Sequence, residues 1–448
     1  MKNLSTFHIA LIALFIIFLM VGTLIFAGVL PGYRQNPGGV AGELTMWGVV
    51  PENLFQPILE KFNQEYKNYF TLQYVEKNAS TLEREFVEAK ADNQAPDLLL
   101  LPHELSLTQR SRLAPLLPDF LSLRQFQDTF IDGSELLVDR EGIIALPLAV
   151  DPIVMYYNKN LLAEAGLATP PQTWSEFVSK TNGLSTLDSR RNITRSAVAL
   201  GETRNIPHAK DLLAMLILQA GNSIVNNNYV SVLNQATDTT VKPAIAVLDF
   251  YTQFADPARS NYAWNRSLPE ARQSFIRGQT VFYFGYASEY PSLARENPHL
   301  AFDVALPPQP TSSVSKPTPK LILGRLLSVA AVRLPAGRQG GGAKMNAAVS
   351  AAWAFAAGEA ARALAETLYL PPARRDLLTT APPDPIMALF NRAALITRGW
   401  LDPDPVATKK IFENMIESVT TGRLQSADAV AAADQQLTAL IQSIYGQN

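Results

Sequence analysis

Aromatic and polar side chains gather at the ends of the predicted strands, where an open sheet presents its residues to a ligand. Aromatic faces stack on sugar rings, and carboxylate and guanidinium groups hydrogen-bond to hydroxyls, so this set of side chains would suit a carbohydrate pocket. Each aromatic could instead fill the hydrophobic core, and the sequence leaves that alternative open. The candidate ligand-binding residues are Trp47, Asp97, His103, Asp151, Tyr286, Arg325 and Trp400.

Motifs for catalysis or metal binding are missing from the sequence. The histidines stand at positions 8, 103, 208 and 299, without the spacing of a zinc site. There is no Gly-x-Ser-x-Gly turn, and no dinucleotide-binding glycine pattern follows the first strand. A pair of glycosidase carboxylates stays open, because such a pair is defined by its arrangement in space. We therefore expect no catalytic residues, no metal site and no cofactor, and we predict that the chain is not an enzyme.

The elements that would position these side chains alternate between strand and helix. The pattern predicts strands over 43–50, 70–75 and 96–101, with a helix beginning at Pro51 and another over 81–91. Continuous apolar runs such as 96–101 are typical of strands buried in parallel sheets. This β-α-β-α-β order predicts an α/β fold with crossover helices.

Further strands and helices follow along the chain. Two strands, 141–150 and 153–157, are separated by Asp151 and Pro152, and Thr173 is placed to cap the helix after it. Later strands are predicted over 279–285, 301–306 and 321–332. The predicted helices are 174–181, 211–220, 242–254, 267–277, 345–357, 359–368, 384–397, 406–420 and 426–444.

Composition narrows the class of protein. Of 448 residues, 47% are hydrophobic and 17% are charged, and the formal net charge is -2, which excludes wholesale disorder. A chain this close to neutral lacks the clustered Lys and Arg of a nucleic-acid-binding surface, so we expect no nucleic acid partner. The absence of cysteine excludes disulfide frameworks, thiolate zinc sites and lipid attachment through cysteine.

The first part of the chain reads as a membrane anchor. Residues 9–30 carry no charge and include Thr23 as a polar side chain, a run long enough to cross a bilayer as a helix. A cleaved signal peptide is the alternative, although its apolar core is normally shorter. We predict an uncleaved transmembrane signal anchor over 1–30 and a flexible tether over 31–42. The soluble part would then lie on the extracytoplasmic side of the cell membrane, with a single membrane pass.

Several segments resemble the extracellular solute-binding proteins of ABC importers, family 1, the group that is similar to maltose-binding protein. The most specific is GIIALPLAVDPIVMYYNKNLLAEAGLATPPQTWSEF over 142–177, and APDLLLL over 95–101 and SFIRGQTVFYFGY over 274–286 are similar to two strands of that family. The resemblance extends from about residue 43 to residue 444. The chain departs from the pattern in lacking the lipoprotein cysteine, in the aromatic residues around Val281, and in an apparent insertion over 335–344.

The resemblance implies a periplasmic-binding-protein-like type II fold, in which two α/β lobes are joined by a hinge. The first lobe would comprise residues 43–149, completed by about 320–358. The second would comprise 150–319, completed by about 359–448. The family also implies that ligand is trapped between the lobes, where the carboxylates of the candidate set would bind hydroxyls and its aromatics would stack.

The function implied by the resemblance is to capture a sugar or oligosaccharide and deliver it to the permease subunits of an ABC transporter. We expect the protein to act as a monomer, anchored in the membrane by its N-terminal helix. Two alternatives remain at this point. One is a sensory ectodomain that works with a signalling partner, and the other is a carbohydrate-active enzyme.

Overall fold

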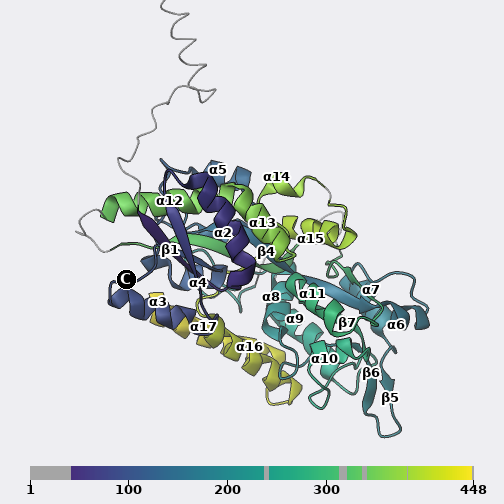
Figure 1. Ribbon diagram of the computed structural model, residues 1–448. Coiled ribbons are helices and arrows are strands. Elements are labelled where there is room, and N and C mark those ends of the chain that lie inside the picture. The colour runs from purple at the N-terminus through teal and green to yellow at the C-terminus, as the bar shows by residue number, and fades with distance from the viewer. Residues whose placement is uncertain (1–41, 237–241, 312–319, 335–340, 381, 446–448) are drawn as a thin grey trace, which may run out of the picture. The chain divides into compact units, whose positions relative to one another are not determined.

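The computed structural model describes residues 42–236, 242–311, 320–334, 341–380 and 382–445 (Figure 1). The predicted membrane anchor over 1–30, and the predicted tether except for Gly42, lie outside these ranges, as does most of the apparent insertion over 335–344. Among the described residues, no helix combines the length and the apolar character needed to span a membrane.

The strands form one mixed 10-stranded sheet, which confirms the predicted α/β fold class. The main path runs through β2 (Thr71–Glu76), β1 (Glu43–Gly48), β3 (Leu98–Pro102), β9 (Ile322–Ala331), β4 (Leu146–Asn158), β7 (Thr280–Tyr286), β6 (Ile193–Val198) and β5 (Thr186–Leu187). The pairs β1–β2, β1–β3 and β6–β7 are parallel, whereas β3–β9, β9–β4 and β4–β7 are antiparallel. In addition, β8 (Phe302–Ala305) pairs with β4, and β10 (Thr397–Arg398) pairs with β9.

Strand β4 links the two halves of this sheet. Its residues 146–152 pair with β9, and its residues 153–157 pair with β7. The predicted break at Asp151 and Pro152 is therefore wrong, since both residues lie inside one continuous strand. Proline has no amide hydrogen but keeps a backbone angle that an extended chain accepts, so it is tolerated where a strand changes partners.

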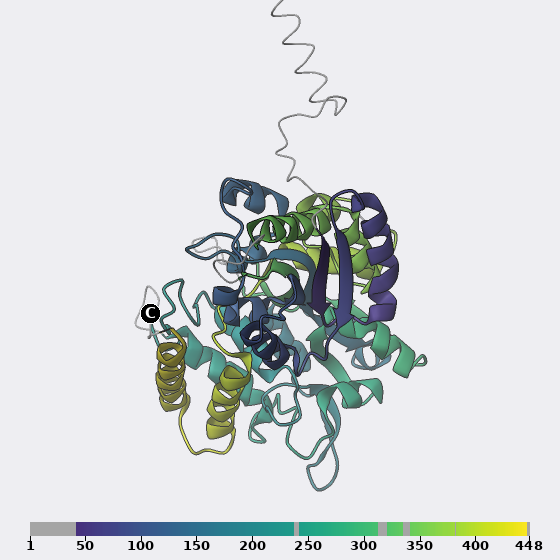
Figure 2. The ribbon, with the colours of Figure 1, turned by 60° about the vertical axis from the view of Figure 1, so that its left-hand side comes forward.

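Helices cover the first half of the sheet, which contains β1, β2 and β3 (Figure 2). The helices α2 (Glu52–Tyr66), α12 (Gly341–Ala357) and α13 (Glu359–Thr367) pack together on it. Phe355 of α12 lies 5.6 Å from Phe55 and 5.2 Å from Phe62 between ring centroids. Helix α13 thus lies with the first half, although the sequence assigned residues after 358 to the second lobe.

The second half of the sheet, with β6, β7 and β8, packs against an aromatic core. Phe177, Phe282 and Phe284 are fully buried there, in ring contacts of 5.4–5.8 Å. The predicted cap of α7 (Trp174–Thr181) is confirmed, because Thr173 Oγ1 accepts the Glu176 N–H at 3.2 Å. The other helices of this core are α8 (Ala209–Gln219), α9 (Pro243–Thr252) and α10 (Ala271–Ile276).

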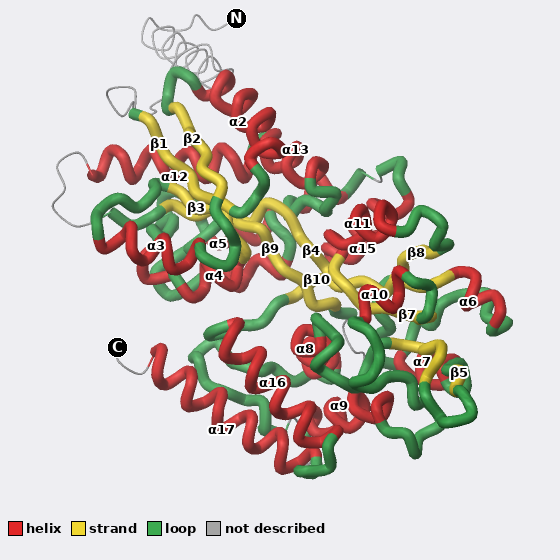
Figure 3. Tube along the Cα trace, turned by 60° about the horizontal axis from the view of Figure 1, so that its bottom comes forward, coloured by secondary structure: helices red, strands yellow, loops and turns green. Residues whose placement is uncertain are grey.

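Two long helices complete this half of the structure. Helices α16 (Pro405–Thr420) and α17 (Ser426–Tyr445) lie side by side and contact α9 (Figure 3). The buried face of α16 includes Ile411, Phe412, Met415 and Ile416, which recur at the spacing of one helix face. The remaining helices are α3 (Leu82–Ala91), α4 (His103–Thr108), α5 (Leu123–Thr129), α6 (Lys159–Glu164), α11 (Tyr290–Glu296), α14 (Arg375–Leu378) and α15 (Pro385–Leu395), with short 3-10 turns such as 110–112 and 132–137.

Candidate functional site

Arg325 connects the two halves of the sheet through its side chain. Its Nη2 donates to Asp211 Oδ2 at 3.0 Å, and its Nε lies 3.3 Å from Glu104 Oε1. The guanidinium also lies 4.2 Å from the ring centroid of Tyr286, in cation–π contact. Glu104 comes from α4 in the first half, whereas Asp211 and Tyr286 come from α8 and β7 in the second. We call these residues, together with Asp151, the Arg325 centre.

Tyr286 and Asp211 hold each other in place within this centre. The Tyr286 hydroxyl donates to Asp211 Oδ2 at 2.9 Å, and the His208 ring meets the Tyr286 ring edge-on at 5.0 Å. Burial and the neighbouring Asp211 carboxylate raise the pKa of Tyr286 well above its usual value. Tyr286 therefore stays protonated and acts as a hydrogen-bond donor.

Asp151 is held by a serine on the other side of the centre. Ser288 donates both its backbone N–H, at 2.9 Å to Oδ1, and its hydroxyl, at 2.7 Å to Oδ2. Burial raises the pKa of Asp151 to about 6, although the Ser288 hydrogen bonds and the Arg325 charge act in the opposite direction. The carboxylate is therefore close to its titration range at neutral pH.

Glu104 has one oxygen that lacks a hydrogen-bond donor. Its Oε2 is buried without a partner among the described residues and lies 3.1 Å from His103 Nδ1. That nitrogen accepts the Leu326 N–H at 3.2 Å. Burial alone would raise the pKa of Glu104, yet the neighbouring His103 ring and then the Arg325 guanidinium lower the pKa to about 2.

The structure brings together four of the seven predicted residues. Asp151, Tyr286 and Arg325 are in the centre, and His103 borders it through Leu326 and Glu104. Sequence reasoning left Glu104 and Asp211 out of the candidate set. Glu104 could have been found as the first carboxylate after β3, beyond the carboxyl end of that strand. The signal for Asp211 was a carboxylate in the first turn of a helix whose later residues are almost all apolar.

The other three predicted residues lie elsewhere. Asp97 is at the amino end of β3, where it accepts the Thr45 N–H at 2.9 Å and lies 2.8 Å from Lys344 Nζ. These contacts tie β1 and α12 to β3. Asp97 is therefore separated from Glu104 by the whole length of that strand.

The two tryptophans differ in their surroundings. Trp47 is half-buried on β1, with Lys77 Nζ 3.9 Å from its ring centroid. Trp400 is buried and lies 6.0 Å from Phe412 between ring centroids, with Lys210 Nζ at 5.8 Å. Lys210 also pairs with Asp402 at 2.7 Å. Trp400 thus packs like a core residue.

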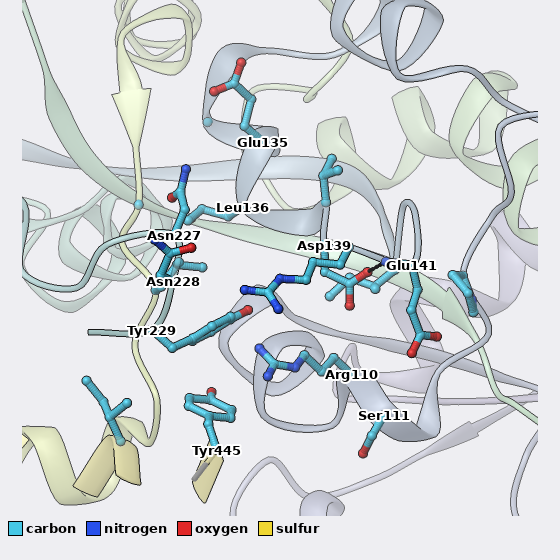
Figure 4. Close-up of a pocket in the computed structure, with 18 of the residues that line it drawn as sticks. Arg110, Ser111, Glu135, Leu136, Asp139, Glu141, Asn227, Asn228, Tyr229 and Tyr445 are labelled. Atoms are coloured by element: carbon cyan, nitrogen blue, oxygen red, sulfur yellow. Dashed lines mark hydrogen bonds between the residues drawn. The ribbon is translucent and has the colours of Figure 1, made fainter. Parts of the chain in front are cut away.

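A cavity of about 780 Å³ lies between residues 110–144 of the first half, the turn at 227–229 and the C-terminal helix α17 (Figure 4). None of the seven predicted residues lines it, although Gly399 and Leu401 beside Trp400 do. Arg110 is stacked against two tyrosine rings here, 4.1 Å from the Tyr229 centroid and 4.3 Å from that of Tyr445. The cavity is therefore distinct from the Arg325 centre.

Among the described residues, neither the Arg325 centre nor the cavity has the ligands of a metal site. Within the part of the chain that the structure describes, no group of three or more His, Asp or Glu side chains is arranged to hold a metal ion. The Arg325 centre instead offers hydrogen-bond acceptors, one guanidinium and an aromatic face, which is the chemistry of a site for a polar organic ligand.

Comparison with known proteins identifies the family. A model of bacterial extracellular solute-binding proteins matches residues 58–387, which is most of the chain. The chain belongs to this family. Because the family consists of binding proteins, this assignment confirms both the resemblance seen in the sequence and the prediction that the chain is not an enzyme.

Solved structures show the same fold for this solute-binding protein. The GacH receptor of Streptomyces glaucescens, solved unliganded and with acarbose, is 16% identical, with a TM-score of 0.66 over 90% of this chain and 99% of that one. A cyclic α-maltosyl-1,6-maltose binding protein of Arthrobacter globiformis is 14% identical, with a TM-score of 0.72 over 90% and 99%. The maltodextrin-binding domain of Bdellovibrio bacteriovorus, bound to maltotriose, is 16% identical, with a TM-score of 0.64 over 89% and 100%.

Proposed function

We propose that this solute-binding protein captures a sugar or oligosaccharide at the Arg325 centre and delivers it to the permease subunits of an ABC importer. It would work as a monomer on the extracytoplasmic side of the cell membrane, held there by the helix predicted over 1–30. The two proposed lobes follow the sequence-based boundaries, except that α13 is assigned to the first lobe because it packs on α2.

The observation that carries this proposal is the bridge made by Arg325. Its guanidinium reaches Glu104 on one side of the sheet junction and Asp211 on the other. A ligand placed beside it would contact both proposed lobes at once. Such contacts favour the closed arrangement of the lobes, and ligand binding would shift the population toward it.

A sugar suits the groups at the centre. The carboxylates of Glu104, Asp151 and Asp211 accept hydrogen bonds from hydroxyls, and Tyr286 provides an aromatic ring beside them. Each sugar hydroxyl has one O–H donor and two acceptor lone pairs. The carboxylates can accept from the donor, and the guanidinium can donate to the lone pairs. The names of the structural relatives refer to acarbose, maltose units and maltotriose, and they support the same class of ligand.

Binding can be tested with a sugar panel. Calorimetry and thermal-shift measurements on the purified extracytoplasmic part should give saturable binding and stabilisation with at least one mono- or oligosaccharide. Small-angle scattering should show a smaller radius of gyration with that sugar, because the lobes close around it. If no carbohydrate in the panel binds, the sugar function is wrong.

Delivery to a permease requires a separate test. In proteoliposomes that contain the partner permease, the ligand-loaded protein should stimulate ATP hydrolysis more than the ligand-free protein does. Equal rates with and without ligand would contradict the role in import and leave sugar binding intact.

A further inference from the structure

We propose that the cavity beside Arg110 is a binding site for a carboxylate, and that its ligand is a saccharide containing a uronic acid. This inference goes beyond the proposed function, which places a sugar at the Arg325 centre, and it can fail without it. Its basis is the unpaired positive charge on the cavity wall and the stacking of Arg110 between two tyrosines.

The two walls of the cavity differ in character. Residues 110–144 of the first half supply most of its charged groups, whereas the turn at 227–229 and helix α17 supply amides and aromatic rings (Figure 4). The volume of about 780 Å³ falls within the range of pockets that hold drug-sized ligands. A ligand in the cavity would contact both halves of the structure, and such contacts favour closure of the proposed lobes.

Two of the four arginines that line the cavity are neutralised by carboxylates. Arg333 forms an ion pair with Glu141, and Arg398 forms one with Asp132. Each of these pairs carries no net charge. Any attraction of the cavity for a charged ligand must therefore come from its other ionisable groups.

The other two arginines, Arg110 and Arg140, leave positive charge in excess. Among the described residues, no carboxylate lies at ion-pair distance from either of them. Of the remaining lining carboxylates, Glu135 points away from Arg110 in Figure 4. Asp139 accepts two backbone N–H groups, at 2.8 and 3.2 Å, and is the one carboxylate left to oppose two guanidinium groups. The chain as a whole has a formal net charge of -2, so this excess is local.

Arg110 is held in an orientation that suits carboxylate recognition. Its guanidinium lies 4.1 Å from the ring centroid of Tyr229 and 4.3 Å from that of Tyr445. Stacking of this kind uses the faces of the guanidinium and leaves the N–H groups of its edge for two parallel hydrogen bonds to a carboxylate. Because Nη1 is enclosed by the protein, the edge formed by Nε and Nη2 is the one that a ligand would meet.

Arg140 supplies an accessible charge beside the same tyrosine. Its side chain is exposed and lines the cavity. Burial raises the pKa of Tyr229, while the charges of Arg110 and Arg140 act in the opposite direction, so both arginines are close to its hydroxyl. Tyr229 therefore stays protonated at neutral pH. A carboxylate beside this hydroxyl would meet two guanidinium groups and a phenol donor.

A uronic acid matches these groups better than other sugars do. Its carboxylate carries one negative charge and accepts charge-assisted hydrogen bonds, which are stronger than those of a neutral hydroxyl. Its ring hydroxyls can bind the exposed amides of Asn227, Asn228 and Gln442 on the opposite wall. An amino sugar would add positive charge beside Arg110 and Arg140.

The test compares a matched pair of trisaccharides by calorimetry on the full-length protein, in a detergent without a sugar headgroup. The pair is trigalacturonate and its fully methyl-esterified form, which have the same rings but differ in charge. We expect the acid to bind about tenfold more tightly than the ester at low salt. The difference should shrink as salt is added, because Arg140 is exposed.

Arginine variants locate the effect. Arg140→Gln should remove most of the difference between acid and ester, and it should fold normally because it changes an exposed side chain. Arg110→Gln should remove the difference as well. Arg124→Gln, which changes an exposed arginine of α5, is the matched control and should preserve it. A neutral sugar that binds the Arg325 centre should bind all three variants equally.

The outcomes separate this site from the proposed function. Equal binding of trigalacturonate and its ester to the unaltered protein overturns the carboxylate site and leaves sugar binding at the Arg325 centre in place. A preference for the acid that survives in both Arg110→Gln and Arg140→Gln also overturns it. If trigalacturonate binds through these arginines while no neutral sugar of the panel binds, the carboxylate site stands and the neutral-sugar function is wrong. Should Arg110→Gln fail to fold, Arg140→Gln decides the question.

Discussion

Asp151 and Arg325 lie opposite each other in the antiparallel pairing of β4 with β9. Opposite charges in directly facing positions stabilise a strand pair, and here they also fix two groups of the Arg325 centre on the strands that join the halves of the sheet. Groups carried by long strands are held more rigidly than groups on loops. The fold itself therefore holds Asp151 and Arg325 in place.

The first prediction concerns the pH dependence of stability that Asp151 confers. Its pKa in the folded state is raised to about 6 from an unfolded value of about 4. The folded state therefore binds the proton more tightly, and the contribution of Asp151 to the free energy of unfolding falls as pH rises from about 4 to about 6. Relative to Asp151→Asn, the unaltered protein should lose about 1–3 kcal/mol between pH 4 and pH 7.

Urea unfolding of both proteins at pH 4.5 and pH 7.5 measures this difference. Comparing the two proteins removes the contributions of the other carboxylates, many of which have lowered pKa values and change stability in the opposite direction. A difference that is the same at both pH values would contradict the raised pKa of Asp151.

The second prediction compares Tyr286 with Tyr283, two buried tyrosines that each donate a hydrogen bond to a carboxylate. Tyr286→Phe removes the hydrogen bond to Asp211 and should lower stability by about 1 kcal/mol. It should also weaken ligand binding, because Asp211 loses one of the two groups that orient it. Tyr283→Phe is the matched control, since Tyr283 donates to Glu289 at 2.8 Å outside the centre. Similar losses of affinity in both variants would argue against a role of Tyr286 in the site.

The third prediction distinguishes the two tryptophans. Trp400→Ala should lower the free energy of unfolding by about 3–5 kcal/mol, because Trp400 is buried and packs on Phe412. Trp47→Ala should lower it much less, since Trp47 is half-buried under Lys77. Chemical denaturation of the two variants and of the unaltered protein provides both measurements. A loss of stability in Trp47→Ala as large as that in Trp400→Ala would assign Trp47 to the core.

The fourth prediction concerns the close approach of chains at the sheet junction. A Cβ at Gly324 would lie 2.6 Å from Thr397 Cγ2 and 3.0 Å from the Asp151 carbonyl oxygen. Gly324→Ala should therefore force β10 away from β9 and lower stability by about 1–3 kcal/mol. Gly342→Ala, where a Cβ meets nothing within 4 Å, should not lower stability and serves as the control. Equal thermal midpoints for the two variants would contradict this close contact.

The fifth prediction concerns Arg110 beside the cavity. Its guanidinium contacts the rings of Tyr229 and Tyr445, so Arg110→Gln should lower stability by about 1–2 kcal/mol. Arg124→Gln is the control, because the Arg124 side chain is 92% exposed. Near-equal stability of the two variants in urea unfolding would show that the stacked arrangement contributes little.

Much of the architecture could be predicted from local sequence patterns. The apolar run over 96–101 predicted β3, and the polar residue before Trp174 predicted the start of α7. These features depend on neighbours a few residues away, so the sequence displays them directly. Long segments with a regular apolar spacing, such as α16, were predicted for the same reason.

The candidate site could be predicted only in part. Asp97 and Glu104 bracket the same strand, and Asp97, at its amino end, ties β1 to β3, whereas Glu104 stands beyond the carboxyl end, where the sequence could have indicated it. Asp211 stands more than a hundred residues from Arg325, so nothing local pointed to their contact. Such pairs arise when β4 and β9 bring separate parts of the chain together.

The sequence by itself therefore determined the fold class, the family and the kind of side chains available for binding, because these follow from local periodicity and from short motifs. Only the tertiary structure decided which carboxylates surround Arg325, that β4 is a single strand across the junction, and that Trp400 is buried. The physical reason is that hydrogen bonds and ion pairs depend on distances of about 3 Å between atoms, and the folded chain sets those distances between residues far apart in sequence.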